Sequence, residues 1–355
     1  MTSYNKMILT LLIPMLISIS GCLDEKVKTT INSDGSCQRM ISMKLQSKSV
    51  PERAFPIAFK GWQEEWRACS DTSTPYEYIA TKSFRTPAEL HDEYLPDSLT
   101  KAMRIDVAIE KRFQWFFTYI DYRETYIYQN PYGHVPVTNF LTTEEIDRFQ
   151  RSEENDTLKK VEHWIQQDQF EEFYAVLVNE AQQMNDPTLP VSLLRDNKER
   201  FAGILADNDS TRKAGKKFSD TTLTQEQILL NIYLEVGEQV FGRAATEKLR
   251  PVMIQAFHAV DVKEKLTKFP DSWEYSAVMP GLLLETNSPS IQGNCVTWKF
   301  SPDQAKVGPY VMHASSRVAN VWAFIVSAGL LLVLVVILVV SIVRRKRISS
   351  PPPIA

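Results

Sequence analysis

The sequence predicts an α+β fold, a mostly antiparallel sheet with a large helical insertion, followed by one C-terminal transmembrane helix. Strand-like patterns of β-branched and aromatic residues fill 27–132 and return at 273–300, whereas helical periodicity dominates 142–269. Uncharged residues fill 321–343, a stretch long enough to cross a bilayer. Because strands precede and follow the helices, we expect one α+β unit, whose sheet closes around an inserted helical section, rather than two domains in tandem.

These patterns divide the 355 residues into six predicted parts. They are a lipoprotein-type signal peptide (1–21), an extracytoplasmic sheet domain (22–141 and 270–300), an inserted helical section (142–269), a juxtamembrane linker (301–320), a transmembrane helix (321–343) and a cytoplasmic tail (344–355). The part outside the membrane is long enough for one large domain with a substantial core.

The N-terminus has the layout of a secretory signal peptide. A weakly positive start precedes the apolar run 7–19, and the small residues Ser20 and Gly21 follow it. The run is shorter than the roughly 20 residues that a membrane span requires. Pro14 weakens it further as a spanning helix. We therefore do not expect a retained N-terminal helix.

Cys22 completes a motif that resembles the bacterial lipobox. In Ile19-Ser20-Gly21-Cys22 the cysteine would be acylated, with palmitate for example, and become the first residue of the mature chain. The alternative is an ordinary signal peptide cut after the small-x-small pattern of Ser18 and Ser20, which leaves Cys22 as a free thiol. We expect lipid attachment at Cys22.

The C-terminal end predicts an orientation. Arg344, Arg345, Lys346 and Arg347 follow the apolar stretch at once, and the positive-inside rule places such a cluster in the cytoplasm. Trp322 lies at the opposite edge, where interfacial aromatic side chains occur. We therefore expect the sheet domain on the outer side of a bacterial cytoplasmic (inner) membrane. The membrane itself is then a partner, through the lipid anchor and the helix.

The sheet domain is expected to begin with a β-hairpin. Two alternating runs within 27–45 are joined by SDGS at 33–36, where Gly35 supplies the positive φ of a tight turn. A strand is predicted over 76–84, and a helix over 86–95 that enters with Thr and then Pro. A further helix is predicted over 55–68 from aromatic residues at helical spacing, namely Phe55, Phe59, Trp62 and Trp66.

Residues 104–132 carry the densest strand signal in the chain. Strands rarely exceed ~10 residues, so we expect a break in this segment near 110–112. Asn130-Pro131 closes the segment. Strand character returns later, at 273–287 and, after a turn around 290–294, at 295–300.

Aromatic residues on both faces of 104–132 are the best candidate for function. One face carries Phe113, Trp115, Phe117 and Tyr119, and the other carries mostly Phe116, Ile120, Tyr122, Tyr126 and Tyr128. A strand that is apolar on both faces must be covered on both, which favours a central strand. Alternatively, one face lines an apolar groove for an acyl chain or a peptide. The candidate lining residues are Trp115, Phe117, Tyr119, Tyr122, Arg123 and Tyr126, with the tyrosine hydroxyls and Arg123 at the polar end of the ligand.

The helical section is expected to start at a capping pattern of Thr142 or Thr143 with Glu145. Its first long helix has one apolar face, formed by Leu158, Val161, Ile165, Phe173 and Leu177. Two more helices are predicted over 223–241 and 247–266, the latter kinked at Pro251. The polar stretch 205–220, which precedes these two helices, is expected to be an exposed loop.

Three of these segments together resemble one known family. The lipobox is followed at once by the hairpin VKTTINSDGS, the last strands read MPGLLLETNSPSIQGNCVTWKF, and a single span comes next. This arrangement resembles the LppM-like bacterial lipoproteins, in which a PG…GN.VTW.F strand pair precedes the span. The resemblance covers 22–45 and 279–343, and implies lipid or glycolipid handling in the cell envelope. It does not extend to the helical section 142–268, which the smaller members lack.

The cysteines leave two interpretations open. Beyond Cys22 the chain has Cys37, Cys69 and Cys295, and an odd count leaves at least one thiol unpaired. They are either three small buried apolar residues, or Cys37 and Cys69 form a disulfide and Cys295 stays free.

No sequence motif promotes catalysis, a cofactor or a metal site. The five histidines fall in different predicted elements, and HExxH, GxSxG, Walker and GxGxxG patterns are absent from the sequence. The adjacent pairs Glu64-Glu65 and Glu171-Glu172 are expected to be solvated helix faces. The net charge of −3, without a basic block outside the tail, argues against a nucleic-acid partner.

The favoured function is therefore a membrane-anchored, non-enzymatic extracytoplasmic domain that binds lipid or an envelope protein at the membrane surface. One alternative is an envelope hydrolase or transferase whose site is assembled only in the fold. Another is a structural scaffold that docks a partner through the helical insertion.

Overall fold

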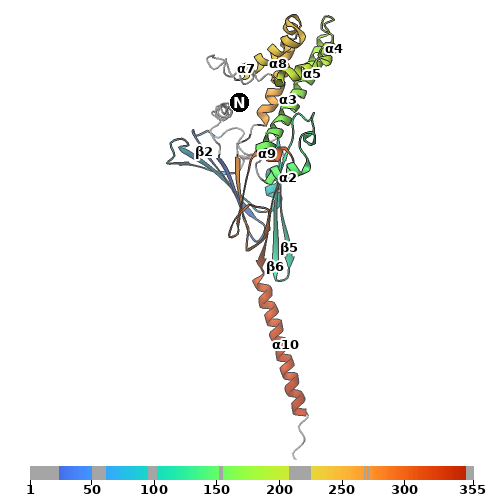
Figure 1. The fold of residues 1–355 in the computed structure, drawn as a ribbon. Helices are drawn as coiled ribbons and strands as arrows, with labels where there is room; N and C mark the ends of the chain where they lie inside the picture. Colours follow the sequence, from blue (N-terminus) through green and yellow to red (C-terminus); the bar gives the residue numbers. More distant parts are fainter. Residues whose placement is uncertain are drawn as a thin grey trace, which may run out of the picture.

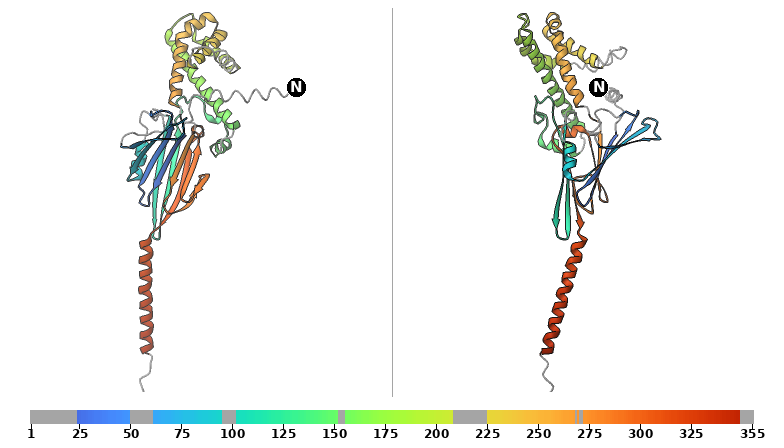
Figure 2. Two further views of the ribbon diagram at one scale, coloured as in Figure 1. Left: turned by 90° about the vertical axis from the view of Figure 1, so that its left-hand side faces the viewer. Right: turned by 180° about the vertical axis from the view of Figure 1, so that it is seen from behind.

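The computed structural model describes residues 24–49, 61–94, 102–151, 155–207, 225–267, 269 and 272–348 (Figure 1). Strands form a β domain in the middle of the molecule, helices form a section at one end of it, and a long helix leaves the other end (Figures 1 and 2). The predicted α+β class with a helical insertion is confirmed.

The β domain consists of two sheets that pack face to face. The seven-stranded sheet has the order β3-β4-β2-β1-β7-β10-β9, and the four-stranded sheet has the order β5-β6-β11-β8. The first contains β1 (Asp24–Ile31), β2 (Cys37–Leu45), β3 (Gln63–Ala68), β4 (Tyr76–Phe84), β7 (Ser272–Val278), β9 (Ser290–Gln292) and β10 (Cys295–Phe300). The second contains β5 (Met103–Gln114), β6 (Phe117–Tyr128), β8 (Leu282–Thr286) and β11 (Tyr310–Ala319).

The helical insertion is closed off by a parallel pair of strands. β1 pairs in parallel with β7, the first strand after the insertion, with Asp24 opposite Ser272 and Thr30 opposite Val278. The other described strand pairs are antiparallel. The sheet therefore closes around the helices, as the order of strand-like and helix-like segments predicts.

The core lies between the two sheets, where strands such as β5 alternate buried apolar residues with more exposed ones. In β5 the side chains of Ile105, Val107 and Ile109 are buried against the seven-stranded sheet, while the residues between them are more exposed. Ile41 of β2 and Trp298 of β10 face them from the other side. Each such side chain contributes about 1.5–3 kcal/mol through burial.

Several predicted local signals are confirmed. Gly35 has φ +93° in the turn between β1 and β2. Thr86 caps α1 (Pro87–Glu93), where its hydroxyl accepts from the Glu89 amide, and Pro87 is at the first position. Thr142 and Glu145 form reciprocal capping bonds at the start of the next helix.

The helix predicted over 55–68 is wrong for its described part, because 63–68 is strand β3, at the edge of its sheet. Trp62 and Trp66 are four residues apart, a spacing that lines up side chains on a strand as well as on a helix. Trp66 packs on Tyr78 with ring centroids 5.0 Å apart, and Trp62 on Phe84 at 6.3 Å. Residues 51–60 lie outside the described part of the chain.

The break predicted near 110–112 is also misplaced. β5 and β6 each have 12 residues, and the turn between them is at Trp115 and Phe116. The charged residues near 110–112 face solvent from a strand rather than form a turn, as Arg112 shows by pairing with Asp121 of β6.

The segment 301–320, predicted to be a linker, folds into a helix and a strand of the β domain. It forms α9 (Pro302–Lys306) and β11, which lies between β6 and β8 in the four-stranded sheet. The residues that β11 buries include the small Ala314 and the polar Ser316, so its strand pattern is weak in the sequence.

The helical section contains α2 (Thr143–Arg151), α3 (Asn155–Met184), α4 (Val191–Asp196), α5 (Lys198–Asp207), α7 (Gln225–Phe241) and α8 (Arg243–Leu266), which contains Pro251. It has an aromatic core of its own, which includes Phe173, Phe201 and Phe257. The loop predicted over 205–220 lies outside the described residues except for the end of α5.

A single described helix, α10 (Val321–Ile348), is long and apolar enough to cross a membrane, over Val321–Arg344. It follows β11 directly, with only Asn320 between them. Its apolar side chains are largely exposed, as lipid-facing residues are.

Candidate functional site

Two of the predicted groove residues, Tyr122 and Tyr126, belong to a buried polar network between the sheets. At its centre the fully buried Arg39 of β2 pairs with Glu124 of β6, with Nη2 and Oε2 2.5 Å apart. The hydroxyls of Tyr122, Tyr126 and Tyr275 all donate to the Glu124 carboxylate. Because these side chains are fully buried, they form part of the core, and the prediction that Tyr122 and Tyr126 line a groove is wrong.

The buried ion pair between Arg39 and Glu124 sets the protonation of the network. Burial disfavours the charged Arg39, but the Glu124 carboxylate offsets this, and the pKa of Arg39 lies well above its ordinary value. Burial, reinforced by the Glu124 charge, raises the pKa of Tyr122 and Tyr126 well above the usual range. The tyrosines therefore remain neutral hydrogen-bond donors to a carboxylate. This arrangement ties the two sheets together in one register.

Trp115 and Phe117 lie elsewhere, in the hairpin tip (residues 113–117) that joins β5 to β6. The tip packs on the first turns of α10 (Figure 1). Its apolar side chains remain accessible, since Phe113 is 56%, Trp115 46% and Phe116 39% exposed. The tip is thus an exposed aromatic surface that continues the apolar surface of the helix.

Four ring contacts connect the tip to α10. Phe113 stacks on Trp322 with centroids 6.1 Å apart, and Trp115 meets the same ring edge-on at 5.4 Å. Phe116 and Phe117 contact Phe324 at 4.8 and 5.9 Å. In addition, Trp115 Nε1 donates to Ser327 Oγ at 3.0 Å.

Asn320, the residue between β11 and α10, fixes the helix to the tip through hydrogen bonds. Its amide nitrogen Nδ2 donates to the Trp115 carbonyl at 2.9 Å, and its Oδ1 accepts from the Thr118 hydroxyl at 2.9 Å. Its backbone N–H donates to the Phe116 carbonyl at 2.8 Å, and its carbonyl accepts from Ala323 of α10. The helix therefore begins as a fixed continuation of the sheet.

Tyr119 and Arg123 lie in a third place, the outer face of the four-stranded sheet. Tyr119 pairs with Arg112 of β5, whose guanidinium lies 5.9 Å from its ring centroid. Arg123 is exposed and borders an open hollow of about 560 Å³. The hollow is lined by His91, Arg104, Asp106, Val107, Ala108, Arg123, Thr125 and Gln129. The six predicted groove residues are thus spread over three separate sites.

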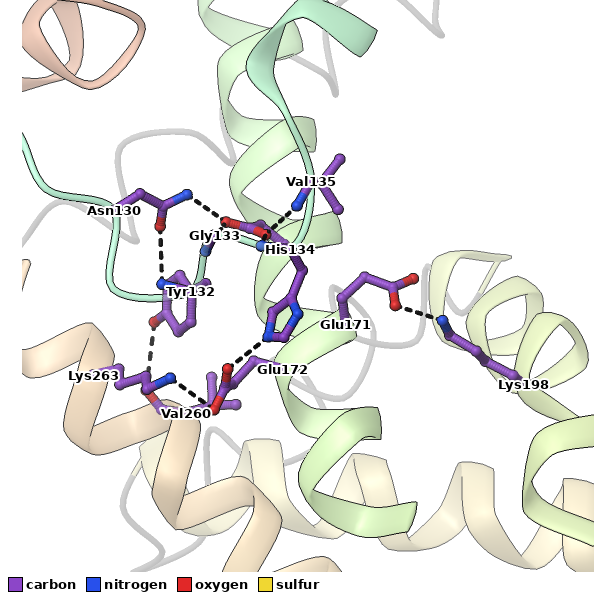
Figure 3. Close-up of polar contacts among 11 residues, drawn as sticks. Asn130, Tyr132, Gly133, His134, Val135, Glu171, Glu172, Lys198, Val260 and Lys263 are labelled. Atoms are coloured by element: carbon purple, nitrogen blue, oxygen red, sulfur yellow. Dashed lines mark hydrogen bonds and ion pairs between the residues drawn. The ribbon is translucent and has the colours of Figure 1, made fainter. Parts of the chain in front are cut away.

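The helical section is attached to the β domain by a polar joint, the contacts of 130–135 with α3 (Figure 3). Asp168 of α3 is buried and accepts four hydrogen bonds, from the Asn130 side chain at 2.6 Å and from the backbone N–H groups of Gly133, His134 and Val135 at 3.3, 2.8 and 2.8 Å. A carboxylate with so many donors holds the segment along the helix.

Glu172, one turn further along α3, binds the same segment to α8. Its carboxylate contacts His134 Nε2 at 2.7 Å and Lys263 Nζ at 2.8 Å. Burial alone would raise the pKa of Glu172, but Lys263 and His134 outweigh it and the pKa is lowered. The prediction that Glu171 and Glu172 form a solvated face is therefore wrong for Glu172, which is buried. Glu171 pairs instead with Lys198 of α5.

Of the two interpretations of the cysteines, the disulfide between Cys37 and Cys69 is not formed: Cys37, Cys69 and Cys295 are free, Cys37 buried and the other two partly exposed. Cys37 is opposite Phe84, at one end of β4, whereas Cys69 follows Ala68, which is opposite Tyr76 at the other end. The two ends of this nine-residue strand are about 26 Å apart, and a disulfide requires Cα atoms within ~7 Å. Burial raises the pKa of the Cys37 thiol to about 11.

Cys22 lies outside the described residues, two positions before β1. Arg344 to Arg347 lie in the last turn of α10, where the apolar stretch ends. One group that could hold a metal ion occurs among the described residues, Glu226, His258 and Asp261, on the exposed side of α7 and α8. Glu226 already pairs with His258 there, at 3.3 Å.

Comparison with known proteins gives one loose likeness. No family model matches the chain, and no curated protein does. Among solved structures, the folded domain of the Mycobacterium tuberculosis LppM protein is similar to it over 84% of this chain and 91% of that chain, with 10% identity and a TM-score of 0.28. The resemblance to LppM stated from the sequence is thus found again only as a loose structural relation.

Proposed function

We propose that this chain is a single-pass bacterial envelope protein whose extracytoplasmic domain binds a partner and is not an enzyme. The apolar stretch Val321–Arg344 supports a span, and the cluster that begins at Arg344 supports a cytoplasmic tail at the inner membrane. Acylation of Cys22 is part of this proposal, on the lipobox alone.

The position of the helical section carries the proposal. It lies at the end of the β domain opposite α10 (Figure 2). The 30-residue α3 alone is about 45 Å long. The buried joint around Asp168 and the rigid start of α10 at Asn320 support a fixed orientation of the whole body. The arrangement therefore favours a scaffold that presents the helical section to an envelope protein, away from the membrane surface.

The polar clusters support a binding role over a catalytic one. The Arg39–Glu124 network is closed to solvent, and its polar groups form hydrogen bonds with one another. In the joint, Asp168 and Glu172 are occupied by structural hydrogen bonds. A hydrolase or transferase requires such groups to converge on an accessible cleft.

Site-specific photo-crosslinking in cells tests the proposal. A photoreactive residue replaces Leu229 of α7 or Val262 of α8, which are 37% and 58% exposed, in the full-length chain. Ile291 of β9, 54% exposed on the β domain, is the matched control. We expect one recurrent protein adduct from the helical positions and none from Ile291. Adducts to lipid alone, or none at either helical position, would contradict the proposed partner.

A further inference from the structure

The hairpin tip of the β domain carries an aromatic surface that the packing of the domain does not require. Phe113, Trp115 and Phe116 are exposed, and they adjoin Trp322 and Phe324 on α10. Monomeric soluble proteins rarely expose such contiguous apolar patches unless the patch contacts a protein or a membrane. The aromatic patch at the tip therefore indicates a contact surface for a protein or a membrane.

The length of α10 places the tip relative to a bilayer. Val321–Arg344 has 24 residues and is therefore about 36 Å long, which exceeds the ~30 Å of a hydrocarbon core. Counting back about 20 residues from Arg344 places the outer hydrocarbon edge near Phe324. Trp322 then lies in the interface, where tryptophan is enriched.

The tip reaches the same depth as this edge. Phe116 contacts Phe324 itself, with centroids 4.8 Å apart, and Trp115 Nε1 bonds Ser327 Oγ, three residues further into the span. Three helical residues correspond to about 4.5 Å. A bilayer that surrounds α10 must therefore also contact the side chains of the tip.

Basic residues lie on the strands that lead into the tip and into α10, and one of them, Arg112, pairs with Asp121. Lys111 and Arg112 precede the tip in β5, and Arg317 of β11 lies with its guanidinium 4.8 Å above the Phe117 ring. An aromatic layer next to basic side chains matches the order of acyl region and phosphate headgroups in a membrane interface. The continuity of the tip with α10 thus selects lipid as the occupant.

We propose that the hairpin tip inserts into the interface of the membrane that α10 crosses, and so binds lipid through Phe113, Trp115 and Phe116. This rests on the proposed function, because it requires α10 to span. The tip gives the domain a second contact with the bilayer beside the helix, which limits tilt and rotation of the body about the point where the helix enters.

Depth-dependent quenching tests the insertion. The full-length chain, with its other cysteines replaced (C22S, C37A, C69S, C295S), receives an NBD label at F116C, at L331C in α10, or at V262C in α8. It is reconstituted in phosphatidylethanolamine/phosphatidylglycerol vesicles that carry nitroxide on the lipid acyl chains. We expect loss of NBD emission at positions 116 and 331 and unchanged emission at 262.

The outcomes separate the two proposals. Quenching at 331 without quenching at 116 overturns the insertion of the tip and leaves the span intact. Emission at 331 that the lipid nitroxide does not quench overturns the span, and the insertion with it. The unmodified chain gives an independent readout by hydrogen exchange: peptides covering 113–117 should take up less deuterium in vesicles than in amphipol. Equal uptake in both overturns the proposal.

Discussion

Arg39 and Glu124 show at the scale of single residues how the two sheets recognise each other. Each comes from a different sheet, and neither has contact with solvent, so the charge of one is compensated only by the other and by the surrounding hydroxyls. Removing one member of a buried ion pair leaves an uncompensated charge, which is the costly case.

Glu124→Gln should lower the free energy of unfolding by about 3–5 kcal/mol, because it leaves the Arg39 charge buried without its counter-ion. Urea unfolding followed by tryptophan fluorescence measures the change. Asp121→Asn is the matched control on the same strand, since Asp121 pairs with Arg112 at the surface. It should cost less than about 1 kcal/mol. Similar losses in the two variants would contradict a special role for the buried pair.

The joint should respond to pH through Glu172. Its pKa in the folded state is lowered below the ordinary 4.5, so its contribution to stability is fully present above pH 4.5 and is lost as the pH falls through the folded-state value. Glu172→Gln should therefore destabilise the protein at neutral pH, and the difference from the wild type should disappear in acid. Unfolding free energies measured from pH 7 to pH 3 give this comparison.

Glu171→Gln is the control for loss of charge on the same helix. Glu171 pairs with Lys198 but does not contact the segment 130–135. A larger loss from Glu171→Gln than from Glu172→Gln at neutral pH would contradict the assignment of the joint.

At the scale of secondary-structure elements, the contact between the hairpin tip and α10 depends on Asn320. Asn320→Ala removes the donor to the Trp115 carbonyl and the acceptor for Thr118, each worth about 1 kcal/mol. We expect faster hydrogen exchange of the amides in 115–119. Asn294→Ala is the control, because Asn294 also bonds a backbone carbonyl, that of Met279, but in a turn without contact to α10. Unchanged exchange in Asn320→Ala would contradict a fixed junction.

Strong local chemistry made some elements predictable from the sequence. The turn at Gly35, the cap at Thr86 and the capping box at Thr142 are encoded by residues that touch one another within a few positions. The sequence does not predict β11, because this strand buries small and polar residues against neighbours far away in sequence. It predicts a helix in place of β3, because the spacing of Trp62 and Trp66 suits both periodicities.

The candidate site could be predicted only in part. Aromatic density draws attention to 104–132, but periodicity alone does not reveal the turn at Trp115 and Phe116. Because of this turn, the aromatic residues at the tip are exposed, whereas Tyr122 and Tyr126 are buried between the sheets. Asp168 and Asn320 were missed altogether. Each is a single polar residue that bonds backbone and side-chain groups more than 30 and 200 positions away, respectively, and no local pattern encodes such contacts.

At the scale of the whole molecule, α10 alone should retain the protein in its membrane. We expect labelled palmitate to enter the wild type but not Cys22→Ser, and both proteins to resist extraction by alkaline carbonate equally. The reason is that the 24-residue apolar stretch is sufficient to span. Release of Cys22→Ser by carbonate would contradict this division of roles.

The parallel pairing of β1 with β7 has a consequence for that acyl group. Shortly after β7 ends, Gly281 lies against Arg317, close to the start of α10. Because β1 runs parallel to β7, β1 also ends on the α10 side of the β domain and begins on the opposite side. Its eight residues rise about 26 Å, and the two residues from Cys22 to Asp24 reach back at most about 7 Å. A fatty acid on Cys22 would thus emerge at least about 20 Å from the end of the β domain at which α10 begins. The two anchors proposed for this chain would then meet lipid at opposite ends of the β domain rather than at one point.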